Sequence, residues 1–160
     1  MRVLIVSDTH GNDRNFERVL MRTYPVDRIF HLGDMEGSET YLEDISPCPI
    51  HMVRGNNDFF SPAPLEQVVE LEGHRVFMTH GHRYGAAFGL ENLKEAAKAR
   101  QCDLVFYGHT HRPMIETEDG VTIINPGSLT YPRQKERKAS YIIMEINGNK
   151  ETDFAINYVE

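Results

Sequence analysis

The sequence predicts an α/β fold with two β-sheets, and three observations support this prediction. Short β-branched apolar runs alternate with amphipathic segments in the first half of the chain. Near-continuous apolar runs of this kind are typical of strands that are covered on both faces. The second half contains two hairpin patterns, which predict a second, more antiparallel sheet packed on the first.

Five apolar runs are predicted strands, and each ends in a cluster of polar residues. They span 3–11, 28–34, 50–58, 74–82 and 103–111. Between the first two, apolar residues recur at helical spacing, with Asn12 as the expected N-cap and Pro25 just beyond the end. The segment 38–45 is a predicted short helix, because Tyr41, Leu42 and Ile45 would share one face, and 90–101 is a predicted helix because strong helix formers dominate it.

Two later segments read as hairpins, and two others as loops. One predicted hairpin turns at Asp119-Gly120 and the other at Asn147-Gly148, each between β-prone runs. The segments 61–64 and 81–89 are rich in proline or glycine and are expected to be loops.

Composition and charge narrow the function classes. The 160 residues are 40% hydrophobic and 26% charged, which favours a single domain over 1–160. A net charge of −7 argues against tight binding of nucleic acids.

Cys48 and Cys102 are far apart, which excludes a cysteine-rich zinc site. The apolar run Val3–Val6 is too short for a signal peptide, and no apolar stretch reaches ~20 residues, so we expect a cytoplasmic protein that does not enter membranes. The sequence leaves open whether the chain forms a homo-oligomer.

Polar residues that follow the five predicted strands form the candidate site. They are Asp8, His10, Asp34, Asn56, Asn57, Asp58, His80, His82, His109 and His111. Because binding crevices of open α/β sheets lie beyond the carboxyl ends of the strands, we expect them at one edge. Asp-x-His and His-x-His pairs would face one side of an extended chain, since side chains alternate there.

The kinds of ligand in this set indicate a catalytic metal site. Carboxylates and imidazoles without thiolates suit Mn²⁺, Fe²⁺ or Zn²⁺ and do not suit a structural zinc cage. The ligands are too many for one ion, and a carboxylate can bridge two ions ~3.5–4 Å apart. The sequence therefore predicts a dinuclear site.

Five ordered motifs resemble those of the calcineurin-like metallophosphoesterases. The motifs are DTHG (8–11), GD (33–34), GNND (55–58), THGH (79–82) and GHTHRP (108–113). NPGS (125–128), followed by PR (132–133), is similar to the small YfcE-like phosphodiesterases. The resemblance runs over essentially the whole chain. It implies a sandwich of two β-sheets flanked by helices, with a two-metal hydrolytic site at the carboxyl ends of the strands.

The resemblance also implies a role for each matching residue. Asp8, His10 and His111 would hold one ion; Asn56, His80 and His109 would hold the other; and Asp34 would bridge them. All seven positions carry the residue type of the family pattern. The resemblance points to Mn²⁺, while Fe, Zn or Ni also suit these ligands. The expected reaction is attack of a metal-activated hydroxide on the phosphorus of a small phosphodiester.

One position departs from the family pattern. Many members have histidine, credited with assisting the leaving group, where this chain has Asn57. The YfcE-like branch commonly lacks it too, so a general acid is in doubt and metal binding is not. We expect Asp58 to orient a ligand, and His82 either to contact substrate or to hold its loop.

The sequence gives weaker support for a functional role of the other polar residues. His31 is expected to be a hydrogen-bonded histidine of the core or beside the ligands, and His51 and His74 are expected on the surface. Arg112 and Arg133 could meet a phosphate, but an exposed arginine is more often a solvated charge.

Two other function classes compete with the phosphodiesterase. A related retromer subunit keeps the fold as a protein-binding scaffold and has lost part of its metal set. The complete ligand set here favours the enzyme over a catalytically weak scaffold. A nuclease is disfavoured by the acidic charge.

Overall fold

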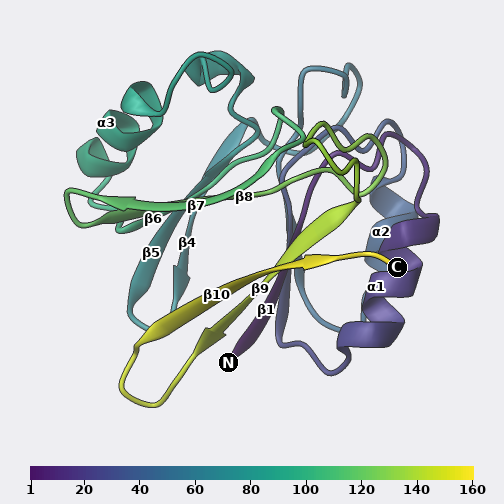
Figure 1. Cartoon of the computed structure of the whole chain (residues 1–160), viewed down its shortest axis with the longest axis horizontal. Coiled ribbons are helices and arrows are strands. Elements are labelled where there is room, and N and C mark those ends of the chain that lie inside the picture. The colour runs from purple at the N-terminus through teal and green to yellow at the C-terminus, as the bar shows by residue number, and fades with distance from the viewer.

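Two five-stranded mixed sheets pack face to face in the computed structural model, which describes all 160 residues (Figure 1). The first sheet has the order β10-β9-β1-β2-β3 and the second the order β4-β5-β6-β8-β7. The strands of the first sheet are β1 (Arg2–Val6), β2 (Arg28–His31), β3 (Ile50–Met52), β9 (Ser140–Ile146) and β10 (Thr152–Tyr158). Those of the second are β4 (Glu66–Leu71), β5 (His74–Thr79), β6 (Leu104–Phe106), β7 (Pro113–Glu118) and β8 (Val121–Pro126).

Helices cover the outer faces of both sheets. The helices α1 (Arg14–Thr23) and α2 (Glu39–Ile45) lie on the first sheet, and α3 (Glu91–Ala99) lies on the second (Figure 1). A short 3₁₀ helix, η1 (His82–Tyr84), precedes α3. None of the helices is both long and apolar enough to span a membrane.

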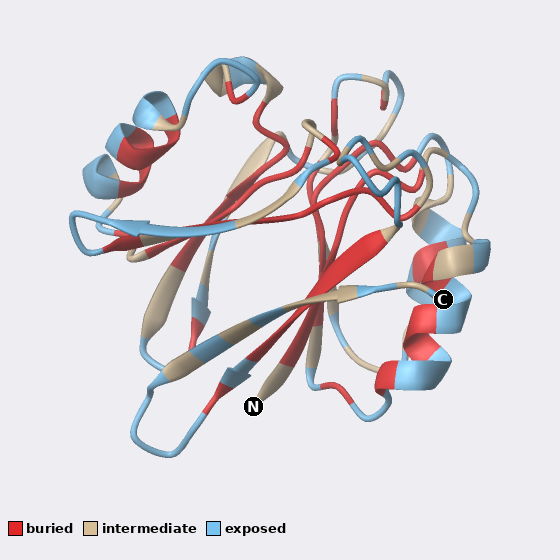
Figure 2. Ribbon diagram, in the orientation of Figure 1, coloured by how far each residue is buried: buried red, intermediate tan, exposed pale blue.

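Three apolar clusters fill the layers and explain why the strands read as continuous apolar runs. In β1, Val3 and Ile5 enter the cluster between the two sheets, while Leu4 and Val6 pack under α1 and α2. The third cluster joins the second sheet to α3. Figure 2 shows the resulting pattern, with buried strands in the interior and helices exposed on their outer sides.

The predicted two-sheet fold is confirmed, but its division between the two halves of the chain was wrong. The first three predicted strands join the first sheet, whereas β5 and β6 join the second. Both predicted hairpins form, yet β9 and β10 extend the first sheet and β7 and β8 the second. Each sheet is mixed because parallel crossover strands and antiparallel hairpins meet in it.

Three local predictions need correction. The N-cap of α1 is Asp13, not Asn12. Strand β4 was not predicted, because it is an edge strand whose charged and polar residues break the apolar run. The 81–89 segment is not wholly a loop, since it contains η1.

Candidate metal centre

The candidate ligands come from the carboxyl ends of strands in both sheets. Asp8 and His10 follow β1, Asp34 follows β2, and His80 follows β5; His109 and His111 follow β6. The prediction of a single sheet edge was therefore wrong, although the predicted convergence is present. Facing layers place their parallel strand ends at the same end of the sandwich, where the connecting segments gather at the top of Figure 1.

Left-handed backbone turns, and not strand alternation, aim these side chains. The φ angles are +56° at Asp8, +50° at His10, +59° at Asp34, +70° at His109 and +60° at His111. Non-glycine residues rarely adopt such angles, at a cost of about 1–3 kcal/mol each, and they cluster at functional sites. The surrounding hydrogen bonds must therefore hold this end of the fold against its local preference.

Four side chains meet closely enough to share one cation. One ligand atom from each of Asp8, His10, Asp34 and His111 lies within 4.8 Å of the others. His10 Nε2 is 3.3 Å from His111 Nε2, which in turn is 3.1 Å from Asp8 Oδ1. Asp8 Oδ1 is buried and has no hydrogen-bond partner.

The remaining candidate ligands lie beside these four. His80 Nε2 is 3.4 Å from Asp34 Oδ2 and 3.8 Å from Asp8 Oδ1, and it too is buried without a hydrogen-bond partner. The His109 ring lies 5.2 Å from the His80 ring, between centroids, and its Nδ1 is 3.1 Å from Asn56 Oδ1. All seven predicted ligands are thus brought to this end of the fold.

Backbone carbonyls fix the tautomers of two imidazoles. The Nδ1 atoms of His80 and His111 lie 2.6 Å from the Leu32 oxygen and 2.7 Å from the Tyr131 oxygen. A carbonyl only accepts, so Nδ1 carries the proton in each case and the Nε2 lone pair of the neutral ring faces the carboxylates. Acceptors that face acceptors need a cation between them, so the arrangement fits metal binding.

The shifted pKa values of the site residues also indicate that a positive charge belongs among these carboxylates. Burial would raise the pKa of Asp8, but His10 and His111 outweigh it and hold that pKa far below its usual range. Burial would also raise the pKa of Asp34, yet His80 and Asn57 lower it to about 2. Burial would lower the pKa of His80, but Asp34 and Asp8 raise it to about 9. Without metal, protons supply the positive charge that these carboxylates require.

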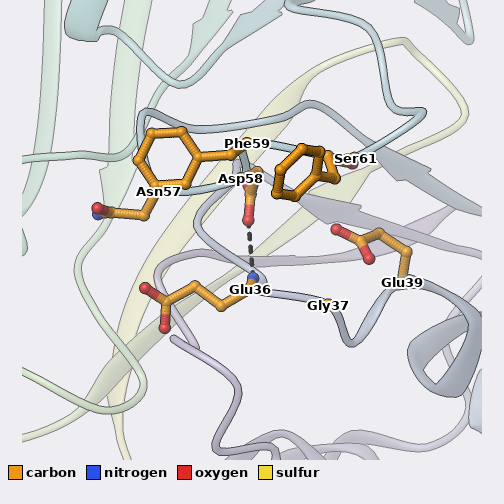
Figure 3. Close-up of a pocket in the computed structure, with 8 residues that line it drawn as sticks. Glu36, Gly37, Glu39, Asn57, Asp58, Phe59 and Ser61 are labelled. Atoms are coloured by element: carbon orange, nitrogen blue, oxygen red, sulfur yellow. Dashed lines mark hydrogen bonds between the residues drawn. The ribbon is translucent and has the colours of Figure 1, made fainter.

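Asp58 and Asn57 hold the loop that carries Asp34. The Asp58 carboxylate accepts hydrogen bonds from the backbone N–H groups of Asp34, Glu36 and Gly55, each at 2.7 Å; Figure 3 shows the bond to Glu36. Asn57 donates its backbone N–H to Asp34 Oδ1 and its side-chain amide to Asp34 Oδ2, both at 2.9 Å. Asn57 therefore holds the Asp34 side chain, and Asp58 holds the backbone around it.

His31 is hydrogen-bonded to residues that neighbour the ligands Asp8, His10 and Asp34. Its ring is fully buried, with Nδ1 accepting from Gly33 N at 3.2 Å and Nε2 lying 3.0 Å from Thr9 Oγ1. Nδ1 accepts only in the neutral ring, so Nε2 carries the proton and donates to Thr9. Burial lowers the pKa of His31 to about 4. His31 thus behaves as the predicted hydrogen-bonded histidine.

The neutral state of His31 predicts a pH dependence of stability. A pKa of about 4 when folded and about 6.5 when unfolded means that stability is fully present above pH 6.5 and is lost as pH falls toward 4, by about 3 kcal/mol. The unfolding free energy of the metal-free protein should therefore fall more steeply in this window for wild type than for His31→Gln. Equal slopes would show that His31 is not held neutral.

The other sequence-predicted residues differ in their placement. His82, at the start of η1, lies with its ring 5.4 Å from that of His80, so it borders the site. His51 and His74 are half-buried, contrary to the surface prediction. His51 stacks on Phe30, and His74 is 2.5 Å from Asp103 Oδ2. Both lie outside the cluster of ligands.

Three residues that sequence reasoning missed hold the site loops. Ser7 Oγ donates to Asp8 Oδ2 at 2.5 Å. Asn125 donates to the Gly108 oxygen at 2.9 Å, and Ser128 Oγ donates to the Asp8 oxygen at 2.8 Å. The last two belong to the NPGS motif, and its position directly after a β-prone run was the available signal.

A buried set of carboxylates and imidazoles that could hold a metal ion lies at the strand ends of a two-layered sandwich, and such ligands without thiolates are typical of catalytic metal sites. Residues 1–149 match the calcineurin-like phosphoesterase superfamily domain, so the chain belongs to that superfamily. The resemblance inferred from the five motifs is therefore confirmed, and membership of this family implies divalent metal ions.

Individual relatives agree with this placement. The phosphodiesterase YfcE of Escherichia coli is 34% identical, in an alignment covering 83% of this chain and 82% of that protein. A structure of a predicted phosphoesterase from Streptococcus pneumoniae has 30% identity and a TM-score of 0.83, covering 99% of this chain and 88% of the other. Vps29 of Entamoeba histolytica, solved with zinc, has 21% identity and a TM-score of 0.77, covering 99% of each chain, and shows the shared fold alone.

Proposed function

We propose that this chain is a phosphodiesterase that uses two divalent transition-metal ions. Mn²⁺ is the first candidate, and Fe, Zn and Ni also suit the ligands. The observation that carries the proposal is the pair of buried, unpartnered atoms Asp8 Oδ1 and His80 Nε2, which face one another across 3.8 Å. Unpartnered buried polar atoms are costly, and bound cations would relieve that cost.

The proposed assignment of ligands is the one that the family resemblance implies, and the position of Asp34 supports it. Asp8, His10 and His111 would hold one ion, and Asn56, His80 and His109 the other. Asp34 would bridge them, because its Oδ2 is 3.8 Å from His10 Nε2 and 3.4 Å from His80 Nε2. This carboxylate oxygen thus borders an imidazole of each proposed ion.

The chain's own residues orient the proposed ligands. When bound, the ions would activate a water molecule and neutralise charge on the phosphoryl oxygens. Asn57 and Asp58 fix Asp34, while the Leu32 and Tyr131 carbonyls fix His80 and His111. Rigid support of this kind holds a site in its productive geometry.

A hydrolysis screen with added Mn²⁺ tests the proposal. We expect bis(p-nitrophenyl) phosphate to be cleaved faster than p-nitrophenyl phosphate, and chelation to abolish both activities. His109→Ala and His111→Ala should lose activity, whereas His51→Ala and His74→Ala, outside the cluster, are the matched controls. Full activity in the first pair, or faster cleavage of the monoester, would contradict the proposal.

A scaffold is the second candidate, and one observation favours it. Phe59 and Phe60 are 78% and 101% exposed beside the candidate centre, and such surfaces often meet a partner. Vps29 shares the fold. A protein that binds two metal ions but cleaves no phosphodiester would favour the scaffold over the enzyme.

Asn57 leads to a prediction about the leaving group. Its amide donates to Asp34 and cannot release a proton near neutral pH, so no acid at this position assists the departing oxygen. A general acid would contribute about 10²–10⁴-fold, so log kcat should fall steeply as the leaving-group pKa rises in a series of aryl phosphodiesters. Asn57→His should flatten that slope. A shallow slope in the wild type would show that another group supplies the proton.

A further inference from the structure

A cavity of about 590 Å³ borders the candidate centre on the side of His109. Its lining includes His109 and Thr110 from the loop after β6, and Arg112 and Arg133 from the segments that follow. Tyr107 and Met114 form part of its apolar wall. The lining of this cavity therefore includes one proposed metal ligand and two arginines.

Backbone hydrogen bonds connect Arg112 and Arg133 to the loop after β6, which carries His109 and His111. Arg112 donates its backbone N–H to Thr110 Oγ1 at 3.3 Å, and Arg133 donates its own to the His111 oxygen at 3.1 Å. Asn125 also donates to Thr110 Oγ1, at 3.0 Å. The backbone that carries each guanidinium is thus fixed relative to His109 and His111.

Neither guanidinium is neutralised by the protein. One carboxylate, Glu116, lines the same cavity, and no ion pair within 4.0 Å joins it or any other acid to Arg112 or Arg133. In a chain of net charge −7, these two arginines are exposed, have no acidic partner and line one cavity beside the proposed site of chemistry. Guanidinium groups without a protein partner suit a phosphate.

A second cavity, of about 450 Å³, borders the other part of the centre and has the opposite character. Glu36, Glu39, Phe59 and Phe60 line it, together with Asn57 (Figure 3). It shares no residue with the first cavity, and Glu36 Oε1 is 3.6 Å from His10 Nδ1. Carboxylates here would repel an anion, so the two cavities distinguish the two arms of a phosphodiester by charge.

We propose that the substrate is a phosphodiester with a second phosphate on one arm, and that Arg112 and Arg133 bind this second phosphate. The other arm is uncharged and lies toward Phe59 and Phe60, whose rings offer an apolar surface to a planar group. This inference rests on the proposed function, and it identifies the substrate class and the residues that select it.

Competition with two dinucleotides that differ by one phosphate tests the inference. Thymidylyl-thymidine and its 5′-phosphorylated form are compared as inhibitors of bis(p-nitrophenyl) phosphate hydrolysis by the Mn²⁺-loaded protein. We expect the phosphorylated form to have an inhibition constant lower by about tenfold or more, the usual scale of a hydrogen bond to a charged group. Arg112→Gln and Arg133→Gln should each bring the two constants closer together.

Arg137→Gln provides the matched control, since Arg137 lies in the same loop as Arg133 and does not line the cavity. It should leave the difference between the dinucleotides intact. The inference is overturned if the phosphorylated dinucleotide inhibits no better than the other, or if both arginine variants keep the full difference. Hydrolysis of bis(p-nitrophenyl) phosphate itself reports on the proposed function, so failure of one is distinguished from failure of the other.

Discussion

Asp34→Ala is expected to lose bound metal from both positions and to lower phosphodiester hydrolysis by well over 100-fold. The Asp34 carboxylate lies between imidazoles assigned to different ions, so its removal affects both. Loss of a group that merely orients a ligand costs about 10–100-fold in affinity or activity, and loss of the shared ligand should exceed this. Elemental analysis after Mn²⁺ loading and desalting, together with kcat/KM, measures both effects.

Asp44→Ala is the control for this variant, because Asp44 is an exposed carboxylate on α2. It should retain metal and activity. If Asp34→Ala kept full metal occupancy and activity, the bridging role of Asp34 would be wrong. Circular dichroism of both variants separates loss of the site from loss of the fold.

Gly108→Ala should also damage the site, for a steric reason. A Cβ at residue 108 would lie 2.1 Å from Ser7 Oγ and 2.8 Å from Asp8 Oδ2, and both residues are fully buried. Overpacking of this kind costs about 1–3 kcal/mol, and relief would require Asp8 to move from its position among the imidazoles. We expect metal binding to weaken and activity to fall by about 100-fold, the upper end of the loss expected when the support of a ligand is disturbed.

Gly148→Ala is the matched control for the glycine variant. No atom lies within 4 Å of the added Cβ there, in the turn between β9 and β10. Its activity and metal content should equal those of the wild type. Wild-type metal affinity in Gly108→Ala would mean that this loop yields without moving Asp8, and the rigid-support account would be wrong.

Sequence patterns predicted the strands that carry the ligands because these strands are buried on both faces. A continuous apolar run that ends in polar residues is visible in the sequence whichever strand lies beside it. Asp8, Asp34 and His109 could therefore be placed at strand ends. The sheet to which each strand belongs depends on contacts far apart in the chain, which local patterns do not encode. Strand β4, at a sheet edge, lacks the burial that produces a clear run.

The means by which the ligands converge could not be predicted from the chain. We predicted from strand alternation that Asp8 would face the same side as His10, and His109 the same side as His111. The structure groups these pairs, but it does so through left-handed backbone turns and not through strand alternation. Such angles are stable only because distant groups such as Ser128 hold the loops, and tertiary hydrogen bonds of this kind leave no periodic signal. Motif spacing identified the residues, whereas the fold determines their direction.

Anomalous diffraction from crystals grown with Mn²⁺ tests the two-ion site most directly. We expect two manganese peaks about 3.5–4 Å apart, as in two-metal hydrolytic sites. One should lie among Asp8, His10 and His111 and the other among Asn56, His80 and His109, with the Asp34 carboxylate between them. A single peak, or manganese bound away from these residues, would contradict the proposed centre.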